Sequence, residues 1–234
     1  MNKYIIETNN LCKKSGSLYR VKDLNLQIPE GLVFGFLGPN GAGKTTTLKM
    51  LLGLIKPTGG NIKFSVENRE KNIGSLIETP GGYGHLTGLE NMQIIQKLKG
   101  ASENDVVKAL HTVRLYDAKD KKLKSYSLGM KQRLGIAMAL LGDPKILILD
   151  EPTNGLDPAG ILEIRTLIRN LSVEKGISVI VSSHILSEIE QMADYIGIID
   201  HGRMLYQGKL SNLETNGKSL EDIFLQMTNG GASL

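Results

Sequence analysis

Apolar positions along the chain gather in short runs that are separated by longer segments with helical spacing. Such runs are typical of β-strands when turn residues bound them. The predicted strands cover residues 4–8, 24–28, 33–37, 61–66, 73–77, 146–149, 177–181, 195–199 and 203–206. The run at 146–149 lacks polar alternation, as expected of a parallel strand that is covered on both faces, and 177–181 is predicted to be a second buried strand. Strands that alternate with helices predict an α/β layered fold.

Helical spacing is clearest in the middle of the chain. Residues 88–115 have helical character, and Ser102 with Asp105 three positions later resembles a capping pair. The apolar residues Val106 and Leu110 follow this pair at helical spacing. Further helices are predicted at 128–141, from Asp157-Pro158 to 171, at 185–192, and near the C-terminus after a capping Ser219.

Composition limits the classes of protein to consider. The chain has 234 residues, of which 41% are apolar, so one large domain can bury a substantial core. A single cysteine, Cys12, excludes an internal disulfide framework and suits a reducing compartment. Residues 1–10 lack the apolar segment of a signal peptide, and no apolar run is long enough to span a bilayer. We therefore expect any action at a membrane to depend on docking to another protein.

The net charge of +4 is small, and only one tight group of lysines stands out. Its members are Lys119, Lys121, Lys122 and Lys124. Because no aromatic residues are interleaved with them, a solvated helix end is favoured over a nucleic-acid patch. No nucleic-acid partner is predicted.

The most informative motif is a glycine-rich loop between the run at 33–37 and a helix-like segment at 46–54, which matches G-x-x-x-x-G-K-[ST] in full. Its glycines let backbone N–H groups face an anion, Lys44 would bind the outer phosphates, and Thr45 would bind Mg²⁺. The alternative, a turn without a ligand, gives no reason for a lysine and a threonine at a helix start. We predict a nucleoside triphosphate site in which Lys44 is also catalytic. Its residues are Gly38, Pro39, Asn40, Gly41, Ala42, Gly43, Lys44, Thr45 and Thr46.

Two carboxylates, Asp150 and Glu151, follow the apolar strand at 146–149. A phosphate-loop fold needs an acidic group at such a strand end to hold the metal, and we assign this role to Asp150. Glu151 would accept a proton from the attacking water. A solvated strand end is the alternative, but two carboxylates beside a buried strand are costly without a cation.

Two further polar groups extend this site. Ser127 and Gly129 stand at a predicted helix start and would form an anion-binding nest, although an ordinary N-cap is the alternative. His184 follows Ser182 and Ser183 at the end of the strand at 177–181. It is either a polar residue at the sheet rim or, beside the Asp150 strand, an imidazole that reaches the γ-phosphate.

With these residues the chain resembles the ATP-binding subunits of ABC transporters over nearly its whole length. The matched elements, in chain order, are the Walker A motif at 38–45, the signature residues Ser127 and Gly129, the Walker B motif at 146–150, the catalytic carboxylate Glu151, the D-loop at 154–157 and the switch histidine His184. The order and spacing of these elements make the resemblance specific.

The resemblance implies the fold and its division. The expected fold is an α/β P-loop NTPase core with a mostly parallel sheet, an N-terminal antiparallel β region and an α-helical subdomain. It forms one ABC ATPase domain over residues 1–234. The implied parts are a nucleotide-binding core at 1–80 and 140–210, a helical subdomain at 81–139, and a C-terminal helix and tail at 211–234.

The resemblance also implies partners and an activity. Two such subunits, identical or related, pack head to tail and hydrolyse ATP to ADP and phosphate with Mg²⁺. Each ATP lies between Lys44 and Thr45 of one copy and Ser127 and Gly129 of the other, and Asp157 of the D-loop is a further nucleotide-binding candidate. The work is delivered to separate transmembrane permease subunits, so the chain is expected to lie peripherally on the cytoplasmic face of the cell membrane. Docking candidates in the helical subdomain are Tyr83, His85, Leu86 and Leu89.

Two departures from the family pattern indicate which branch of the family the chain resembles. Members usually carry a Gln where Glu78 follows the strand at 73–77, and the signature keeps only Ser127 and Gly129. Both features resemble the branch that exports bacitracin and lantibiotics, including immunity and resistance pumps. The exported substrate is then an antimicrobial peptide that the permease contacts. We predict Glu78 as a metal ligand, because a carboxylate is a stronger hard ligand than an amide.

A third departure concerns the adenine. Family members commonly stack an aromatic residue on the base, and this sequence has Ser15 at that place. Tyr19 is the nearest aromatic and is predicted to stack instead. The alternative is that Tyr19 only packs on the β region and the base is weakly held.

Other functions are weighed against this one. An exporter of a drug, lipid or polysaccharide would use the same ATPase. Soluble ABC ATPases of translation or DNA repair generally carry two cassettes or a long coiled coil, whereas this chain has one cassette and no heptad run. A GTPase is disfavoured because the sequence has no Asn-Lys-x-Asp motif.

Overall fold

The structure is a computed structural model that describes residues 3–78, 81–213 and 220–229. Its strands are β1 (Tyr4–Ser15), β2 (Leu18–Leu24), β3 (Gln27–Pro29), β4 (Val33–Leu37), β5 (Gly59–Phe64), β6 (Ile73–Leu76), β7 (Ile146–Asp150), β8 (Ser178–Ser183), β9 (Tyr195–Asp200) and β10 (Arg203–Lys209). Its α-helices are α1 (Lys44–Leu51), α2 (Arg69–Asn72), α3 (Gly88–Lys99), α4 (Glu103–Thr112), α5 (Leu128–Leu140), α6 (Pro158–Lys175), α7 (Leu186–Glu190) and α8 (Leu220–Asn229).

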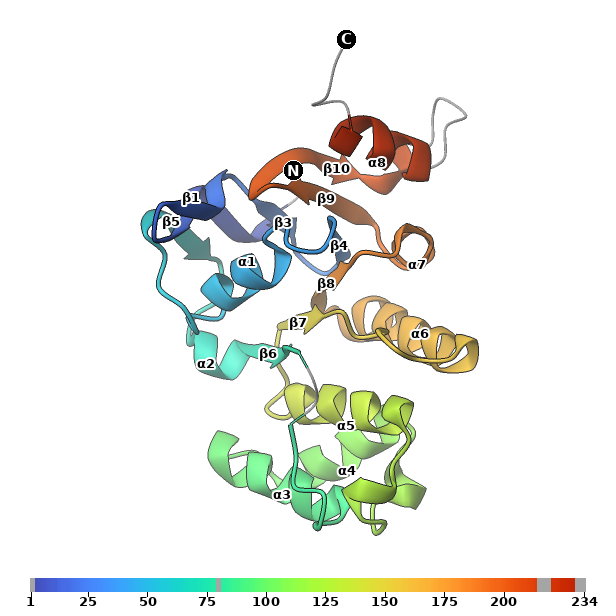
Figure 1. Ribbon diagram of the computed structural model, residues 1–234. Coiled ribbons are helices and arrows are strands. Elements are labelled where there is room, and N and C mark those ends of the chain that lie inside the picture. The colour runs from blue at the N-terminus through green and yellow to red at the C-terminus, as the bar shows by residue number, and fades with distance from the viewer. Residues whose placement is uncertain (1–2, 79–80, 214–219, 230–234) are drawn as a thin grey trace.

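A central sheet organises the fold, with strand order β10-β9-β4-β8-β7-β6. All neighbouring pairs from β9 to β6 are parallel, and only β10 runs antiparallel to its neighbour β9. Figure 1 shows the N-terminal strands and α1 beside this sheet, while α6 and α7 lie on its other side. Helices α3, α4 and α5 gather in a separate lobe beyond the edge strand β6. The predicted α/β fold with a mostly parallel sheet is confirmed.

Two hydrophobic cores form on the two faces of the sheet. Within β4, Val33 and Leu37 belong to the core that packs on α5 and α6, whereas Phe34 and Phe36 belong to the core under α1 and the N-terminal strands. Side chains alternate between faces along a strand, so a strand covered on both faces must be apolar throughout. All five residues of β4 and of β7 are buried, which explains the missing polar alternation.

The N-terminal strands form a second sheet, in which β1 pairs antiparallel with β2, β3 and β5. The prediction of one strand at 24–28 is wrong, because β2 ends at Leu24 and β3 begins at Gln27. Asp23, with φ of 50°, changes the chain direction before Asn25, whose amide donates to the Asp23 carbonyl at 3.2 Å. Strand β2 was not predicted, since its first three residues are exposed and the strand shows no apolar run.

Capping residues set the limits of the helices in the lobe. Ser102 and Asp105 form the predicted capping box at the start of α4, and Thr87 with Glu90 forms another at the start of α3. The helical character predicted over 88–115 is divided between these helices, because Gly100 takes a left-handed conformation with φ of 64° and ends α3.

Lys99 ties α3 to the end of α5. Its ammonium donates to the carbonyls of Ala139 at 3.2 Å and of Leu141 at 3.0 Å. Burial lowers the pKa of Lys99, because an apolar environment disfavours the charged form. Carbonyls at a helix C-terminus lack hydrogen-bond donors within the helix. The lysine supplies these donors, and the carbonyl oxygens in turn stabilise its buried ammonium.

Other helix and hairpin predictions fit with small shifts. Helix α6 begins after Asp157 as predicted but continues to Lys175, where Gly176 ends it, and α7 is shorter than predicted. The β9–β10 hairpin turns at His201-Gly202 as predicted. The predicted cap Ser219 lies outside the described residues. The lysines at 119–124 lie at the ends of short 3₁₀ helices: Lys119 follows Tyr116–Ala118, and Lys122 precedes Leu123–Ser125, which contains Lys124.

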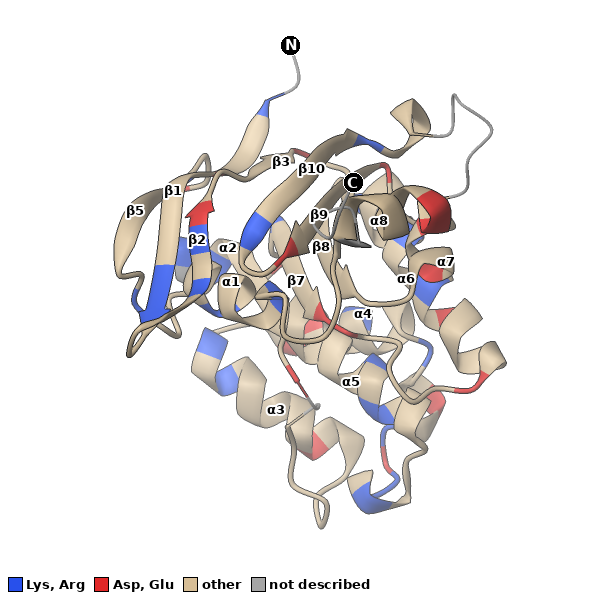
Figure 2. Cartoon of the chain, turned by 45° about the horizontal axis from the view of Figure 1, so that its top comes forward, with Lys and Arg blue, Asp and Glu red and all other residues tan. Residues whose placement is uncertain are grey.

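Charged residues are dispersed over the structure. Figure 2 shows Lys and Arg on elements in each part of the chain, including β1, β2, α3 and α5, with Asp and Glu between them. Across the described ranges, no helix combines the length and apolarity that crossing a membrane requires.

The contact between β6 and α5 gives a test of the fold. A Cβ at Gly74 would lie 2.2 Å from the Ala139 carbonyl oxygen, a backbone atom that has little room to move. We expect Gly74→Ala to lower the free energy of unfolding by about 1–3 kcal/mol, measured as a lower denaturant midpoint. Gly84→Ala is the matched control, since its Cβ would only reach Lys124 Cβ at 3.6 Å. Equal midpoints for the two variants would contradict this packing.

Candidate functional site: the phosphate loop and the strand ends

The glycine-rich loop connects β4 to α1, and its shape leaves no room for side chains at two points. A Cβ at Gly38 would lie 2.3 Å from the Ile199 carbonyl oxygen. Gly43 has φ of 109°, and a Cβ there would lie 2.7 Å from the Arg20 carbonyl oxygen. The β9–β10 turn holds the loop through a backbone hydrogen bond, in which Gly202 N donates to the Ala42 carbonyl at 2.9 Å. The loop is therefore held between β2 and the hairpin.

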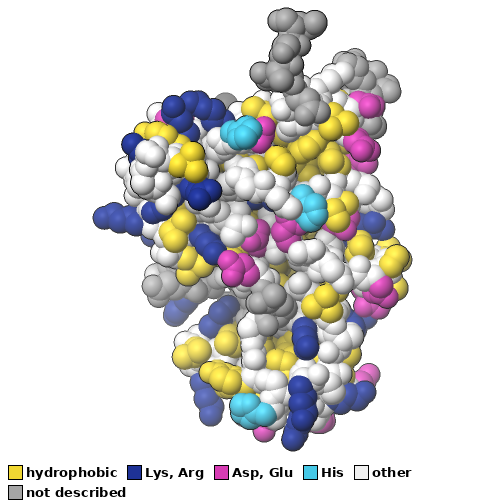
Figure 3. Space-filling view, in the orientation of Figure 1, with side chains coloured by type: hydrophobic (Ala, Val, Ile, Leu, Met, Phe, Trp, Pro, Cys, Tyr) yellow, Lys and Arg dark blue, Asp and Glu magenta, His cyan; other side chains and the backbone are white. Residues whose placement is uncertain are grey.

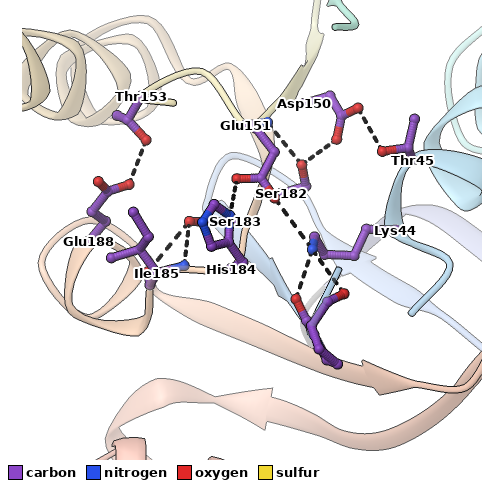
Figure 4. A network of polar contacts seen from close by, with 12 residues as sticks. Lys44, Thr45, Asp150, Glu151, Thr153, Ser182, Ser183, His184, Ile185 and Glu188 are labelled. Carbon is purple, nitrogen blue, oxygen red and sulfur yellow. Dashed lines mark hydrogen bonds and ion pairs between the residues drawn. The ribbon is translucent and has the colours of Figure 1, made fainter. Parts of the chain in front are cut away.

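Lys44 places a buried cation over this loop. Its side chain is only 6% exposed, and Nζ donates to the Gly38 carbonyl at 2.7 Å and to the Pro39 carbonyl at 3.4 Å. The ammonium also lies 3.3 Å from Glu151 Oε1, as Figure 4 shows. A buried ammonium is stable only with such oxygens around it. The lysine is thus oriented between the loop and the acidic end of β7.

Oxygen donors gather where α1 meets β7 and β8. Thr45 Oγ1 donates to Asp150 Oδ2 at 2.8 Å, and the buried Ser182 hydroxyl donates to the other oxygen of Asp150. Asp150 and Ser182 are direct neighbours in the parallel register of β7 and β8. Carboxylate and hydroxyl oxygens are hard ligands that suit Mg²⁺, which takes its remaining ligands from water and phosphates. The donor set of Thr45 and Asp150 therefore fits this ion.

Glu151 is held in a rare backbone conformation at the end of β7. Its φ is 48°, and its N–H donates to the Ser182 hydroxyl at 3.0 Å and to the Ser182 carbonyl at 3.2 Å. A positive φ in a residue other than glycine often marks a functional position. Here it directs the carboxylate to Lys44 on one side and to His184 on the other (Figure 4).

His184 lies 2.8 Å from Glu151, measured from Nδ1 to Oε2. An ionised carboxylate can only accept hydrogen bonds, so Nδ1 carries the proton of this contact. The imidazole thereby fixes the Glu151 carboxylate, and its Nε2 is left for another partner. This places a carboxylate able to accept a proton beside a cation that attracts phosphates.

These residues surround a cavity of about 430 Å³. Of the predicted site residues, those that line it are Pro39, Asn40, Gly41, Gly43, Lys44, Thr45, Thr46, Glu151 and His184. Asn154, from the predicted D-loop, lines it too, as does Arg20, which was not predicted. Arg20 belongs to β2, which the sequence pattern did not show, so only the folded arrangement brings it to the loop.

Other predicted residues lie away from this cavity's lining. Ser127 caps α5, accepting from Met130 N at 3.2 Å, and Asp157 caps α6, accepting from Gly160 N at 3.1 Å. Gly129 lies in the first turn of α5. Within one chain these residues have capping or helical roles, and their contribution to a nucleotide site in a second copy stays a prediction.

Tyr19 is exposed on β2 and does not line the cavity. The ammonium groups of Lys14 and Lys22 each lie 5.2 Å from the centre of its ring. Stacking of Tyr19 on adenine stays a prediction.

Glu78 pairs with a lysine of α1. Its Oε1 lies 2.6 Å from Lys49 Nζ, and its backbone has φ of 63°. The metal-binding role predicted for Glu78 also stays a prediction.

The glycine loop, the buried lysine and the acidic strand end together define a P-loop nucleoside triphosphatase. The sequence profile of the ABC transporter family matches residues 21–154. The chain is 49% identical to the bacitracin transport ATP-binding protein BcrA of Enterococcus faecalis, over 92% of this chain and 72% of that protein. It is 42% identical to the lantibiotic transport ATP-binding protein SrtF of Streptococcus pyogenes, over 94% of this chain and 96% of that protein.

Solved structures agree with these relatives. An ATP-binding subunit of an ABC transporter superimposes with a TM-score of 0.83 at 28% identity, covering 95% of this chain and 99% of that one. A dimeric cassette, MJ0796, in a post-hydrolysis state bound to ADP and Pi superimposes with a TM-score of 0.76 at 28% identity, covering 88% and 98%. This chain belongs to the ABC transporter family, as an ATP-binding subunit with the ABC ATPase fold, and it is an ATPase coupled to transport.

Arg20 and Tyr19 can be compared directly as candidate contacts of ATP. We expect Arg20→Ala to weaken ATP binding by roughly three- to tenfold, because a guanidinium in the cavity can stack on the base or pair with a phosphate. Tyr19→Ala should have a smaller effect, since the ring lies outside the cavity. Titration calorimetry with ATP measures both. A larger loss of ATP affinity in Tyr19→Ala than in Arg20→Ala would instead support stacking of Tyr19 on the adenine.

Proposed function

We propose that this chain is the ATP-hydrolysing subunit of an exporter of antimicrobial peptides, in lantibiotic immunity or bacitracin-type resistance. The observation that carries the proposal is the identity of 42–50% to the bacitracin and lantibiotic transport ATP-binding proteins over more than nine tenths of this chain. The site supports the same activity, because a P-loop lysine and an acidic strand end serve phosphoryl transfer to water.

Each site residue has a distinct step in hydrolysis. Lys44 exchanges its contacts with loop carbonyls and Glu151 for the outer phosphates of ATP. Glu151 then accepts the proton of the attacking water, and His184 holds the Glu151 carboxylate in place. Thr45 and Asp150 would hold Mg²⁺, which neutralises charge on the phosphates when bound. The loop N–H groups and the start of α1 add further positive potential.

A second ATPase copy completes the site in this proposal. Ser127 is exposed at the start of α5, and Asp157 is exposed at the start of α6, so both helix ends are open to a partner. Together with Gly129 they would meet the ATP held by Lys44 of the partner copy, which is either identical or a related ATPase. The similar cassette MJ0796 forms a dimer with ADP and Pi, which supports this arrangement. ATP then stabilises the closed dimer by binding it more tightly than the open one.

Separate transmembrane permease subunits would receive the work, with this chain bound peripherally on the cytoplasmic face of the membrane. Figure 3 shows hydrophobic side chains among Lys and Arg side chains on the lower lobe, which α3, α4 and α5 form. Tyr83 and His85 are exposed there, with ring centres 6.0 Å apart, while Leu86 and Leu89 are half-buried. Exposed apolar groups with a charged rim suit a protein–protein contact. The peptide itself would contact the permease.

A cellular experiment tests the proposed function. Cells that lack this chain should become more sensitive to bacitracin or to a nisin-like peptide, and the wild-type gene should restore resistance. Glu151→Gln should not restore it, because the amide cannot accept the proton. Glu103→Gln, an exposed change in the first turn of α4, is the control and should restore resistance fully. Unchanged sensitivity to both classes of peptide would reject peptide export and favour another substrate.

The same Glu151→Gln protein should bind MgATP and stay dimeric, because binding remains while hydrolysis stops. Light scattering after gel filtration, with and without MgATP, measures this. A variant that hydrolyses ATP at nearly the normal rate would remove Glu151 from the role of base.

Glu78 gives a separate prediction about the metal. A carboxylate binds Mg²⁺ more strongly than an amide, although Lys49 competes for it at 2.6 Å. We expect Glu78→Gln to require several-fold more Mg²⁺ for half-maximal ATPase activity and to lower transport. Lys49→Met should shift the Mg²⁺ requirement in the opposite direction. An unchanged Mg²⁺ titration and unchanged transport in Glu78→Gln would show that Glu78 is not a metal ligand.

A further inference from the structure

Two loops that carry the hydrolytic residues are joined at two points. The first contact is between Glu151, at the end of β7, and His184, which follows β8. The second contact lies deeper, where the Thr153 hydroxyl donates to Glu188 Oε2 at 2.5 Å. Figure 4 shows both contacts between the same pair of chain segments. The segments at 151–153 and 184–188 therefore form a closed ring that contains the candidate base.

The Thr153–Glu188 contact is the buried one. Thr153 is 3% exposed and Glu188 is 5% exposed. Within the described part of the chain, the only hydrogen bond recorded for the Glu188 carboxylate comes from Thr153. A buried carboxylate is costly unless it is hydrogen-bonded, so separating this pair is unfavourable. Neither residue is part of the cavity lining. A contact with the nucleotide therefore does not explain why a hydroxyl and a carboxylate are buried at these two positions.

Because Glu188 is close to His184 in the sequence, the Thr153–Glu188 pair affects the position of His184. Glu188 lies four residues after His184, in the first turn of α7, at the far end of the segment 184–188. The near end of that segment is fixed as well, since Ile185 N donates to the Ser183 hydroxyl at 2.9 Å. Thr153 is two residues after Glu151, with Pro152 between them. Proline restricts the backbone, so a displacement of Thr153 is transmitted to Glu151.

We propose that Thr153 and Glu188 are positioning residues that set the contact between Glu151 and His184. The pair makes the turn after β7 and the start of α7 move as one unit. The His184–Glu151 contact therefore forms only when this turn, which leads to Asp157, is in place. This role rests on the proposed function of Glu151 in hydrolysis and deepens it.

Kinetics on matched variants test the proposal in the full-length chain with its ATPase partner. Thr153→Val keeps the shape of threonine and removes the hydroxyl, while Thr153→Ser keeps the hydroxyl. We expect Thr153→Val to lower kcat by about tenfold or more with the KM for ATP changed less than about twofold, because an aligned base acts in the transition state. Thr153→Ser should keep kcat within about threefold of the wild type. An anchor that only stabilises the fold would leave kcat of the folded fraction unchanged.

A spectroscopic measurement reads the contact itself. In protein labelled with ¹⁵N-histidine, the Nδ1 signal of His184 reports its hydrogen bond to Glu151, and His184→Gln identifies the signal. We expect Thr153→Val and Glu188→Ala to shift this signal in the same direction as Glu151→Gln does, and Thr153→Ser to leave it in place. The double variant Thr153→Val with Glu188→Ala should be no worse than the more affected single variant, since both remove one interaction.

Wild-type kcat in a folded Thr153→Val protein, or an unmoved His184 signal, would overturn the proposal. Denaturant unfolding and ATP affinity identify a variant that fails to fold. If Thr153→Val fails to fold, the His184 signal of Glu188→Ala decides the proposal. These outcomes are separate from failure of the proposed function. If Glu151→Gln hydrolyses ATP normally, the assigned base is wrong, whereas normal Thr153→Val beside inactive Glu151→Gln rejects only the positioning pair.

Discussion

The buried ammonium of Lys44 is the constraint on which the site depends. It needs oxygen partners, and the loop carbonyls of Gly38 and Pro39 and the carboxylate of Glu151 supply them. Those partners are themselves placed by tight backbone packing, since Gly38 lies against Ile199 and Gly43 against Arg20. A triphosphate in this site can take the place of oxygens that surround the cation. Preorganised charge of this kind is what lowers the cost of stabilising a transition state.

The fold delivers these groups through one property of parallel sheets. The strands β4, β8 and β7 are adjacent and parallel, so their carboxyl ends meet at one edge. The loop follows β4, Glu151 follows β7, and His184 follows β8. Burial of both faces keeps the strands rigid, and the ring through Thr153 and Glu188 extends that order into the loops. The geometry of the candidate site is thus a consequence of strand order and of a few buried polar contacts.

Local patterns predicted much of this arrangement. The P-loop, the Asp150-Glu151 strand end and the Ser102 cap were visible because each depends on neighbouring residues in the sequence. The covered strands were visible because burial on both faces removes polar residues. The family resemblance, confirmed by the relatives, supplied the order of the remaining motifs.

What the sequence could not predict depends on contacts between distant residues. Strand β2 is an exposed edge with little apolar pattern, and its Arg20 reaches the cavity only through pairing with β1. The Thr153–Glu188 bond joins residues 35 positions apart, and nothing local marks either as buried. Ser127 and Gly129 lie away from the cavity of their own chain, so even the folded monomer does not place them at a nucleotide.

The affinity of MgATP for Lys44→Met tests the central claim most directly. Loss of the buried cation should weaken binding by at least about tenfold in titration calorimetry, because one or more charge-assisted contacts to phosphate disappear. The exposed Lys56→Met variant should bind as the wild type does. A folded Lys44→Met protein with unchanged affinity for MgATP would contradict the account.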